Sequence, residues 1–138
     1  MINPILLMAV FEVKHLVADF FLQNEYMLGK FKRTGWELPL AAHCAVHAVF
    51  TGVIALLVKP EVNWVLWAMF MDFICHFSMD RIKASPDLLG RFTALTKETY
   101  HSASEAQKHS NKWFWYTLGI DQFVHNLTHL FIVWVLTK

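Results

Sequence analysis

Histidine and aspartate residues recur in pairs four positions apart at four places in this 138-residue sequence. On a helix, residues four apart lie one turn apart on the same face, so the two side chains of a pair can bind one metal ion or flank two. HExxH zinc helices use the same spacing. The pairs are His15/Asp19, His43/His47, His76/Asp80 and Asp121/His125. We therefore predict that these eight residues are metal ligands.

The mixture of imidazole and carboxylate groups limits the choice of metal. Borderline-soft Zn²⁺, or Mn²⁺ or Fe²⁺, suits such ligands better than Ca²⁺ or Mg²⁺. We expect divalent metal ions, two of them, with zinc favoured and manganese or iron as alternatives. Cys44 and Cys75 lie in apolar runs outside any CxxC pattern, and we expect them to be free thiols that pack as small hydrophobic side chains.

Further polar residues accompany the pairs and could orient the ligands by hydrogen bonds or serve as extra ligands. They are Gln23, Asp72, Gln122, Asn126 and His129. Two of them, Asp72 and His129, extend existing pairs by one more turn toward the middle of their apolar segments.

Four residues are candidates for a direct catalytic role. Asp19, Asp80 or Asp121 could act as a general base where it is not fully engaged as a ligand. Lys83 follows Asp80 by three residues and could neutralise a substrate phosphate. The alternative for Lys83 is a helix-end lysine whose ammonium group reaches water.

Four long apolar segments must position these side chains. They cover residues 4–23, 38–58, 62–83 and 113–136, each near the ~20 residues that cross a bilayer as a helix. Hydrophobic residues make up 56% of the chain and charged residues 17%, against about 25% charged in soluble domains. We predict an all-α fold: one transmembrane domain over residues 1–138, a polytopic four-helix membrane bundle with a polar metal-binding core.

The connections between the segments predict an orientation. Lysine and arginine concentrate in residues 24–37 and in the longer polar loop 84–112. The positive-inside rule then places both connections in the cytoplasm and both termini outside, in a bacterial inner membrane. Arg91, Lys97 and Tyr100 belong to the longer loop, which we expect to cover the site.

With this orientation, the four pairs come to one depth. At 1.5 Å per residue they lie in a layer ~6–18 Å below the cytoplasmic surface. An ionisable side chain inside the membrane costs at least ~2.5–3.5 kcal/mol, so the groups must face the bundle interior and compensate one another or a bound cation. A metal-free proton relay or polar network is the alternative reading.

Four strings of the chain together resemble the signature of a bacterial and phage membrane-protein family that is catalogued only as a domain of unknown function. They begin at His15 (HLVADFFLQ), His43 (HxxxH), His76 (HFSMDRIK) and Asp121 (DQxxH). The resemblance implies a helical membrane protein with a polar core and carries no established activity. A weaker likeness is to the membrane-bound metal-dependent hydrolases.

The ligand types and depth favour a membrane-embedded hydrolase that acts on a phosphate- or ester-containing amphiphile at the cytoplasmic headgroup level. One alternative is a di-iron membrane oxidoreductase. The other is a non-enzymatic protein, either a metal or proton transporter or a metal-stapled membrane protein that binds a partner. We expect membrane lipids and a second copy of the chain as partners. A net charge of +1 argues against nucleic acid.

Overall fold

The structure of the protein is a computed structural model that describes residues 2–89, 101–109 and 111–138. The elements are α1 (Pro4–Leu16), a π-helix η1 (Val17–Phe21), a 3-10 helix η2 (Met27–Phe31), α2 (Glu37–Val58), α3 (Val62–Ala84), α5 (Glu105–His109) and α6 (Lys112–Leu136). The all-α class is confirmed, since every regular element in these ranges is helical. Three of the four apolar segments become α-helices within a residue or so of the expected bounds.

The first segment differs from the expected continuous helix 4–23. Asn3 caps α1 by accepting a hydrogen bond from the Ile5 amide at 2.9 Å, and Pro4 takes the first helical position, where no amide is needed. The α-helix ends at Leu16 and the chain continues as η1. At 1.5 Å per residue, the 13 residues of α1 cover about 20 Å, less than the ~30 Å hydrocarbon core of a bilayer.

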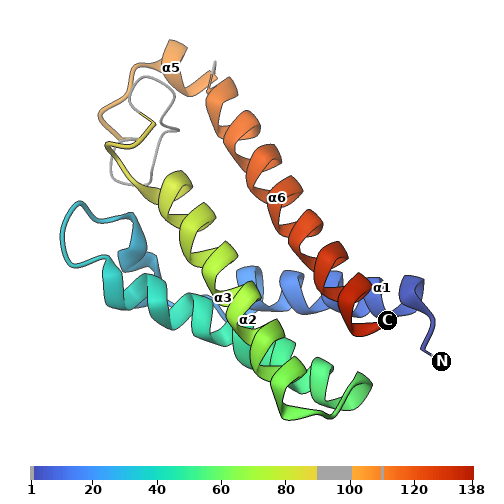
Figure 1. Cartoon of the computed structure of the whole chain (residues 1–138). Helices are drawn as coiled ribbons and strands as arrows, with labels where there is room; N and C mark the ends of the chain where they lie inside the picture. The colour runs from blue at the N-terminus through green and yellow to red at the C-terminus, as the bar shows by residue number, and fades with distance from the viewer. Residues whose placement is uncertain (1, 90–100, 110) are drawn as a thin grey trace.

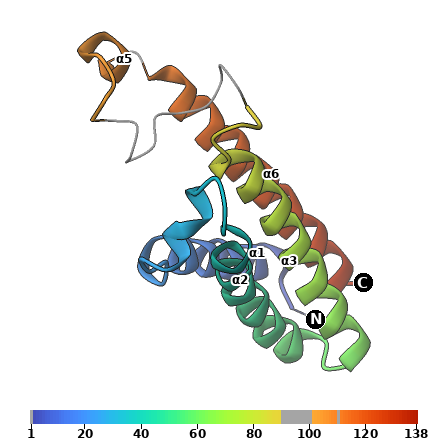
Figure 2. The same ribbon diagram turned by 90° about the vertical axis from the view of Figure 1, so that its left-hand side faces the viewer.

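The four long helices do not all run side by side. α3 and α6 lie next to each other with opposite chain directions, and α1 lies crosswise to both of them (Figures 1 and 2). The two chain ends lie near each other at one end of this arrangement (Figure 1). Among the described helices, α2 and α3 are long and apolar enough to cross a membrane by length and composition. Membrane crossing by each of the four long helices stays a prediction.

Apolar and polar side chains occupy separate layers of the interior. The apolar layer draws on all four long helices and lies toward the chain ends; its buried members are Leu7, Phe11, Ala55, Ala68, Ile132, Val133 and Leu136. The polar layer lies next to it, toward η1 and η2. In the described residues, 13 buried side chains are polar or charged, nearly half of the interior, and these must find polar partners.

Candidate metal centre

The π-helix η1 places Asp19 against three histidines of the polar layer. Its defining hydrogen bond runs from the Leu22 amide to the Val17 carbonyl at 3.0 Å, five residues apart. π-turns are rare and occur frequently at functional sites. The sequence pairing His15 with Asp19 anticipated a regular helical turn, and the structure keeps the pair together through the wider turn: His15 Nε2 lies 3.1 Å from Asp19 Oδ2.

The Asp19 carboxylate faces imidazoles with both of its oxygens. Asp19 Oδ1 lies 3.0 Å from His47 Nε2 and 3.3 Å from His43 Nε2, both on α2. Asp19 Oδ2 faces His15 from the other side. One carboxylate thus lies between imidazoles from α1 and α2, and Asp19, His43 and His47 form a group that could hold a metal ion.

Asp80 on α3 takes a similar position between α2 and α6. Its Oδ2 lies 3.0 Å from His43 Nε2, and its Oδ1 lies 3.9 Å from His125 Nε2. Asp121 completes this side of the cluster, with Oδ1 3.8 Å from His125 Nδ1. The structure therefore brings Asp80, Asp121 and His125 into one group of neighbouring ligand atoms.

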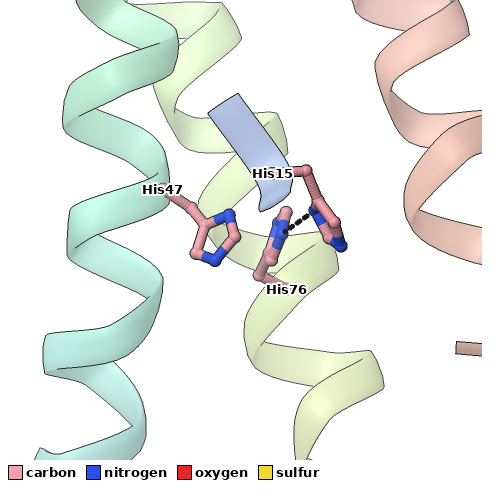
Figure 3. Close-up of side chains that lie close together, drawn as sticks. All are labelled: His15, His47 and His76. Atoms are coloured by element: carbon pink, nitrogen blue, oxygen red, sulfur yellow. Dashed lines mark hydrogen bonds between the residues drawn. The ribbon is translucent and has the colours of Figure 1, made fainter. Parts of the chain in front are cut away.

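His76 joins the cluster from the middle of α3. Its Nδ1 donates a hydrogen bond to the Asp72 carbonyl at 2.9 Å, which leaves Nε2 as the acceptor nitrogen. That Nε2 is hydrogen-bonded to His15 Nδ1 at 3.4 Å, and the His76 ring lies against His47 at a centroid distance of 3.8 Å (Figure 3). A ligand histidine usually donates its other ring N–H in this way, so His76 is oriented for coordination.

The distances between Asp19 and its three histidines are compatible with a bound metal ion. Two ligands bonded to one ion at ~2.0–2.1 Å lie roughly 3.0–3.4 Å apart, and their lone pairs point at the ion rather than at each other. His15 Nε2 and His43 Nε2 lie at such distances from Asp19 but have no hydrogen-bond partner in the described chain, although they are buried. Both ring nitrogens of His125 and Asp121 Oδ1 are also without a hydrogen-bond partner there.

Three lysines contact the aspartates of the polar layer. Each ammonium group lies against one Oδ2: Lys14 against Asp72 at 2.7 Å, Lys30 against Asp80 at 2.8 Å and Lys83 against Asp121 at 2.6 Å. Asp19 has no lysine of this kind among its described contacts. It faces imidazoles alone, which makes it the carboxylate most in need of a cation.

Lys14 and Lys30 were not anticipated as parts of the site. Lys30 lies in a connection whose lysines we expected on the cytoplasmic surface, yet it is buried in η2. Gly29 lets η2 approach α2 closely, because a Cβ at this position would lie 2.9 Å from Pro39 Cγ. The partner of Lys30 is Asp80 on α3, 50 residues further along the chain. No local sequence pattern links the two residues, so the sequence alone did not predict this contact.

Asp72 and His129 form a second polar centre next to the first. Asp72 Oδ2 accepts hydrogen bonds from Lys14 and, at 2.9 Å, from the Thr51 hydroxyl; Asp72 Oδ1 lies 3.5 Å from His129 Nε2. The Lys14 ammonium group is the counter-ion of Asp72 here. The Asp72 side chain therefore joins its own helix α3 to α1, α2 and α6, while the Asp72 carbonyl orients His76, in keeping with a supporting role.

The remaining supporting residues divide into two groups. Gln122 donates to Asp121 Oδ2 at 3.2 Å, and the Asn126 amide, in its better orientation, donates to Glu12 Oε2 at 2.9 Å. Glu12 Oε1 in turn lies 3.2 Å from His129 Nδ1, which explains a carboxylate inside an apolar segment. Gln23 is half-buried after η1, and no hydrogen bond joins it to the cluster within the described ranges.

Other expectations concern the surroundings of the site. Arg91, Lys97 and Tyr100 lie outside the described residues. Cys44 and Cys75 are free thiols, as expected. The two polar connections meet at one end of the molecule, where Arg33 pairs with Asp87 at 2.9 Å.

Fold and site together define an all-helical protein whose interior holds a cluster of histidines, aspartates and lysines, with His/Asp groups that could hold a metal ion. The chain belongs to the family described as Protein of unknown function (DUF3307), whose profile matches residues 6–138. This confirms the expected uncharacterised family. No curated protein and no solved structure matches the chain.

Proposed function

We propose that this protein is a membrane-embedded metal-dependent hydrolase with two divalent metal ions, acting on a phosphate- or ester-containing amphiphile at the headgroup level. One observation carries the proposal. The Asp19 carboxylate lies 3.0–3.3 Å from imidazoles on both of its sides, and two of those imidazole nitrogens have no hydrogen-bond partner in the described chain. Divalent metal ions held by Asp19 and these histidines would satisfy these atoms.

The distribution of side chains supports the membrane setting. Large apolar side chains are exposed on every long helix, for example Ile5, Leu57 and Trp134, whereas most charged residues of the polar layer are buried. Soluble monomers rarely expose continuous apolar surface on this scale. In a bilayer the same surface faces lipid, and the buried charges meet the requirement that ionisable groups turn inward and pair.

The chain's own residues can be given roles around a reacting water molecule. Two bound metal ions would lower the pKa of a bridging water and polarise a phosphoryl or carbonyl oxygen. Asp121 is the best candidate for the general base, because its Oδ1 has no described hydrogen-bond partner, whereas Asp19 and Asp80 each face more than one imidazole. Lys83 lies at the edge of the cluster, where its ammonium can meet a substrate.

A specific observation favours a second candidate, a metal-free polar network that moves protons or ions. The ammonium groups of three lysines already offset most of the charge on the four aspartates of the layer. Proton flux into liposomes, with a chain that binds no metal, would identify this function. A coloured, iron-filled protein with visible absorption would instead identify the di-iron oxidoreductase.

Turnover by detergent-purified, zinc-loaded protein tests the hydrolase. We expect release of phosphate from a short-chain phosphatidic acid, or of acid from a short-chain ester, that a chelator abolishes and added metal restores. Asp121→Asn should lower kcat by about 10²–10⁴-fold, the usual contribution of a general base, with metal content unchanged. Asp87→Asn is the matched control, since Asp87 is an exposed aspartate paired with Arg33. Full activity in Asp121→Asn would contradict the assigned role.

A further inference from the structure

The charge of the polar layer limits what the site can bind. Its described carboxylates belong to Asp19, Asp72, Asp80, Asp121 and Glu12, and three lysines pair with Asp72, Asp80 and Asp121. The set therefore carries two net negative charges. One divalent cation neutralises it, and two leave two positive charges, more than a single bridging hydroxide offsets.

We infer that the substrate group held in this site is an anionic phosphate, not a neutral ester, and that Lys83 is the side chain that binds it. The inference rests on the proposed metal-dependent function and names its substrate class. An uncompensated positive charge in a buried site is costly, and a phosphate supplies the missing negative charge together with oxygens that accept several hydrogen bonds.

Lys83 differs from the other two lysines in its access to the outside. Its side chain is 21% exposed, whereas those of Lys14 and Lys30 are 2% and 4% exposed. It stands in the last turn of α3, which ends at Ala84. Lys83 is thus the ammonium group, among the three, that an arriving ligand can reach.

Asp121, the partner of Lys83, keeps a second hydrogen-bond donor if Lys83 moves away. Asp121 Oδ2 accepts a hydrogen bond from the Gln122 amide as well as from Lys83, so this oxygen keeps a donor when the lysine turns away. Asp121 Oδ1 faces His125 without a described hydrogen-bond partner and remains available as the general base proposed above. A cation held beside it by Asp80 and His125 would weaken the attraction between Asp121 and Lys83 and leave the ammonium group free for an anion.

Phosphate binding by the Mn²⁺-loaded protein tests the inference, measured as the ³¹P relaxation of inorganic phosphate that bound Mn²⁺ causes. Lys83→Gln should weaken phosphate binding by at least about tenfold, the effect of losing one charge-assisted hydrogen bond, with manganese content unchanged. Lys83→Arg should retain binding. The matched control is Lys32→Gln, because Lys32 is exposed, and it should leave affinity within about twofold, as expected for a surface charge.

The possible results distinguish a failure of the Lys83–phosphate inference from a failure of the proposed metal-dependent hydrolase. Equal phosphate affinity in wild type and in metal-loaded Lys83→Gln would overturn the inference and leave the hydrolase standing. Wild-type protein that binds no metal would overturn the proposed function itself, and the inference with it. A short-chain phosphatidic acid that binds more tightly than inorganic phosphate identifies a lipid phosphate as the source, and equal binding identifies a soluble one; both support the inference, provided that Lys83→Gln weakens them.

Discussion

Replacing Asp72 with leucine is expected to destabilise the protein by about 3–5 kcal/mol, because it leaves the Lys14 ammonium buried without its counter-ion. The Lys14 and Asp72 side chains are 2% and 0% exposed, and their ion pair joins α1 to α3. The substitution also removes the acceptor of the Thr51 hydroxyl. Chemical unfolding in detergent, followed by circular dichroism, measures the change.

A second substitution distinguishes a charge effect from a loss of packing. The double variant Asp72→Leu with Lys14→Met removes both charges, and replacing a buried ion pair by apolar side chains is often close to neutral. We therefore expect it to recover most of the lost stability. Arg33→Ala is the surface control, since the exposed Arg33–Asp87 pair is worth less than about 1 kcal/mol. A double variant as unstable as Asp72→Leu would contradict the account of this ion pair.

Replacing His43 with alanine is expected to lower metal affinity by more than the ~10–100-fold that follows loss of a ligand's supporting partner. His43 Nε2 lies 3.3 Å from Asp19 Oδ1 and 3.0 Å from Asp80 Oδ2, so it links the two carboxylates that face imidazoles on both sides. Competition with a coloured chelator measures the affinity.

The control for this prediction is His101→Ala, because His101 is an exposed histidine away from the four helical pairs. It should retain wild-type affinity and stoichiometry. If His43→Ala also binds metal as the wild type does, metal binding takes place elsewhere, and the cluster around Asp19 is a polar network without a metal.

The helical pairs were readable from the sequence because their signal is local. A spacing of four residues places His43 and His47 on one face of α2. Because ionisable side chains are costly to expose to lipid, that face is expected to turn toward the protein interior, and the pairs of the four segments are then expected to meet there. The all-α class and the bounds of α2, α3 and α6 have the same origin. Apolar runs of about twenty residues end at Pro60 or at Ser85-Pro86, where the helix cannot continue.

The contacts that the sequence did not predict are those between distant elements. Lys30 belongs to a short polar connection and is indistinguishable by pattern from its exposed neighbour Lys32. Its burial depends on the close packing of η2 on α2 at Gly29. The π-turn at Asp19 and the crosswise placement of α1 likewise depend on how the helices pack, since the apolar pattern of residues 4–23 is compatible with a straight helix.

The metal content of the wild-type protein tests the central claim most directly. Elemental analysis of the detergent-purified chain should find close to two divalent ions per chain, and X-ray absorption should find nitrogen and oxygen ligands at about 2.0–2.2 Å without sulfur. A stably folded protein that takes up no metal ion, even when zinc, manganese and iron are supplied, would contradict the account.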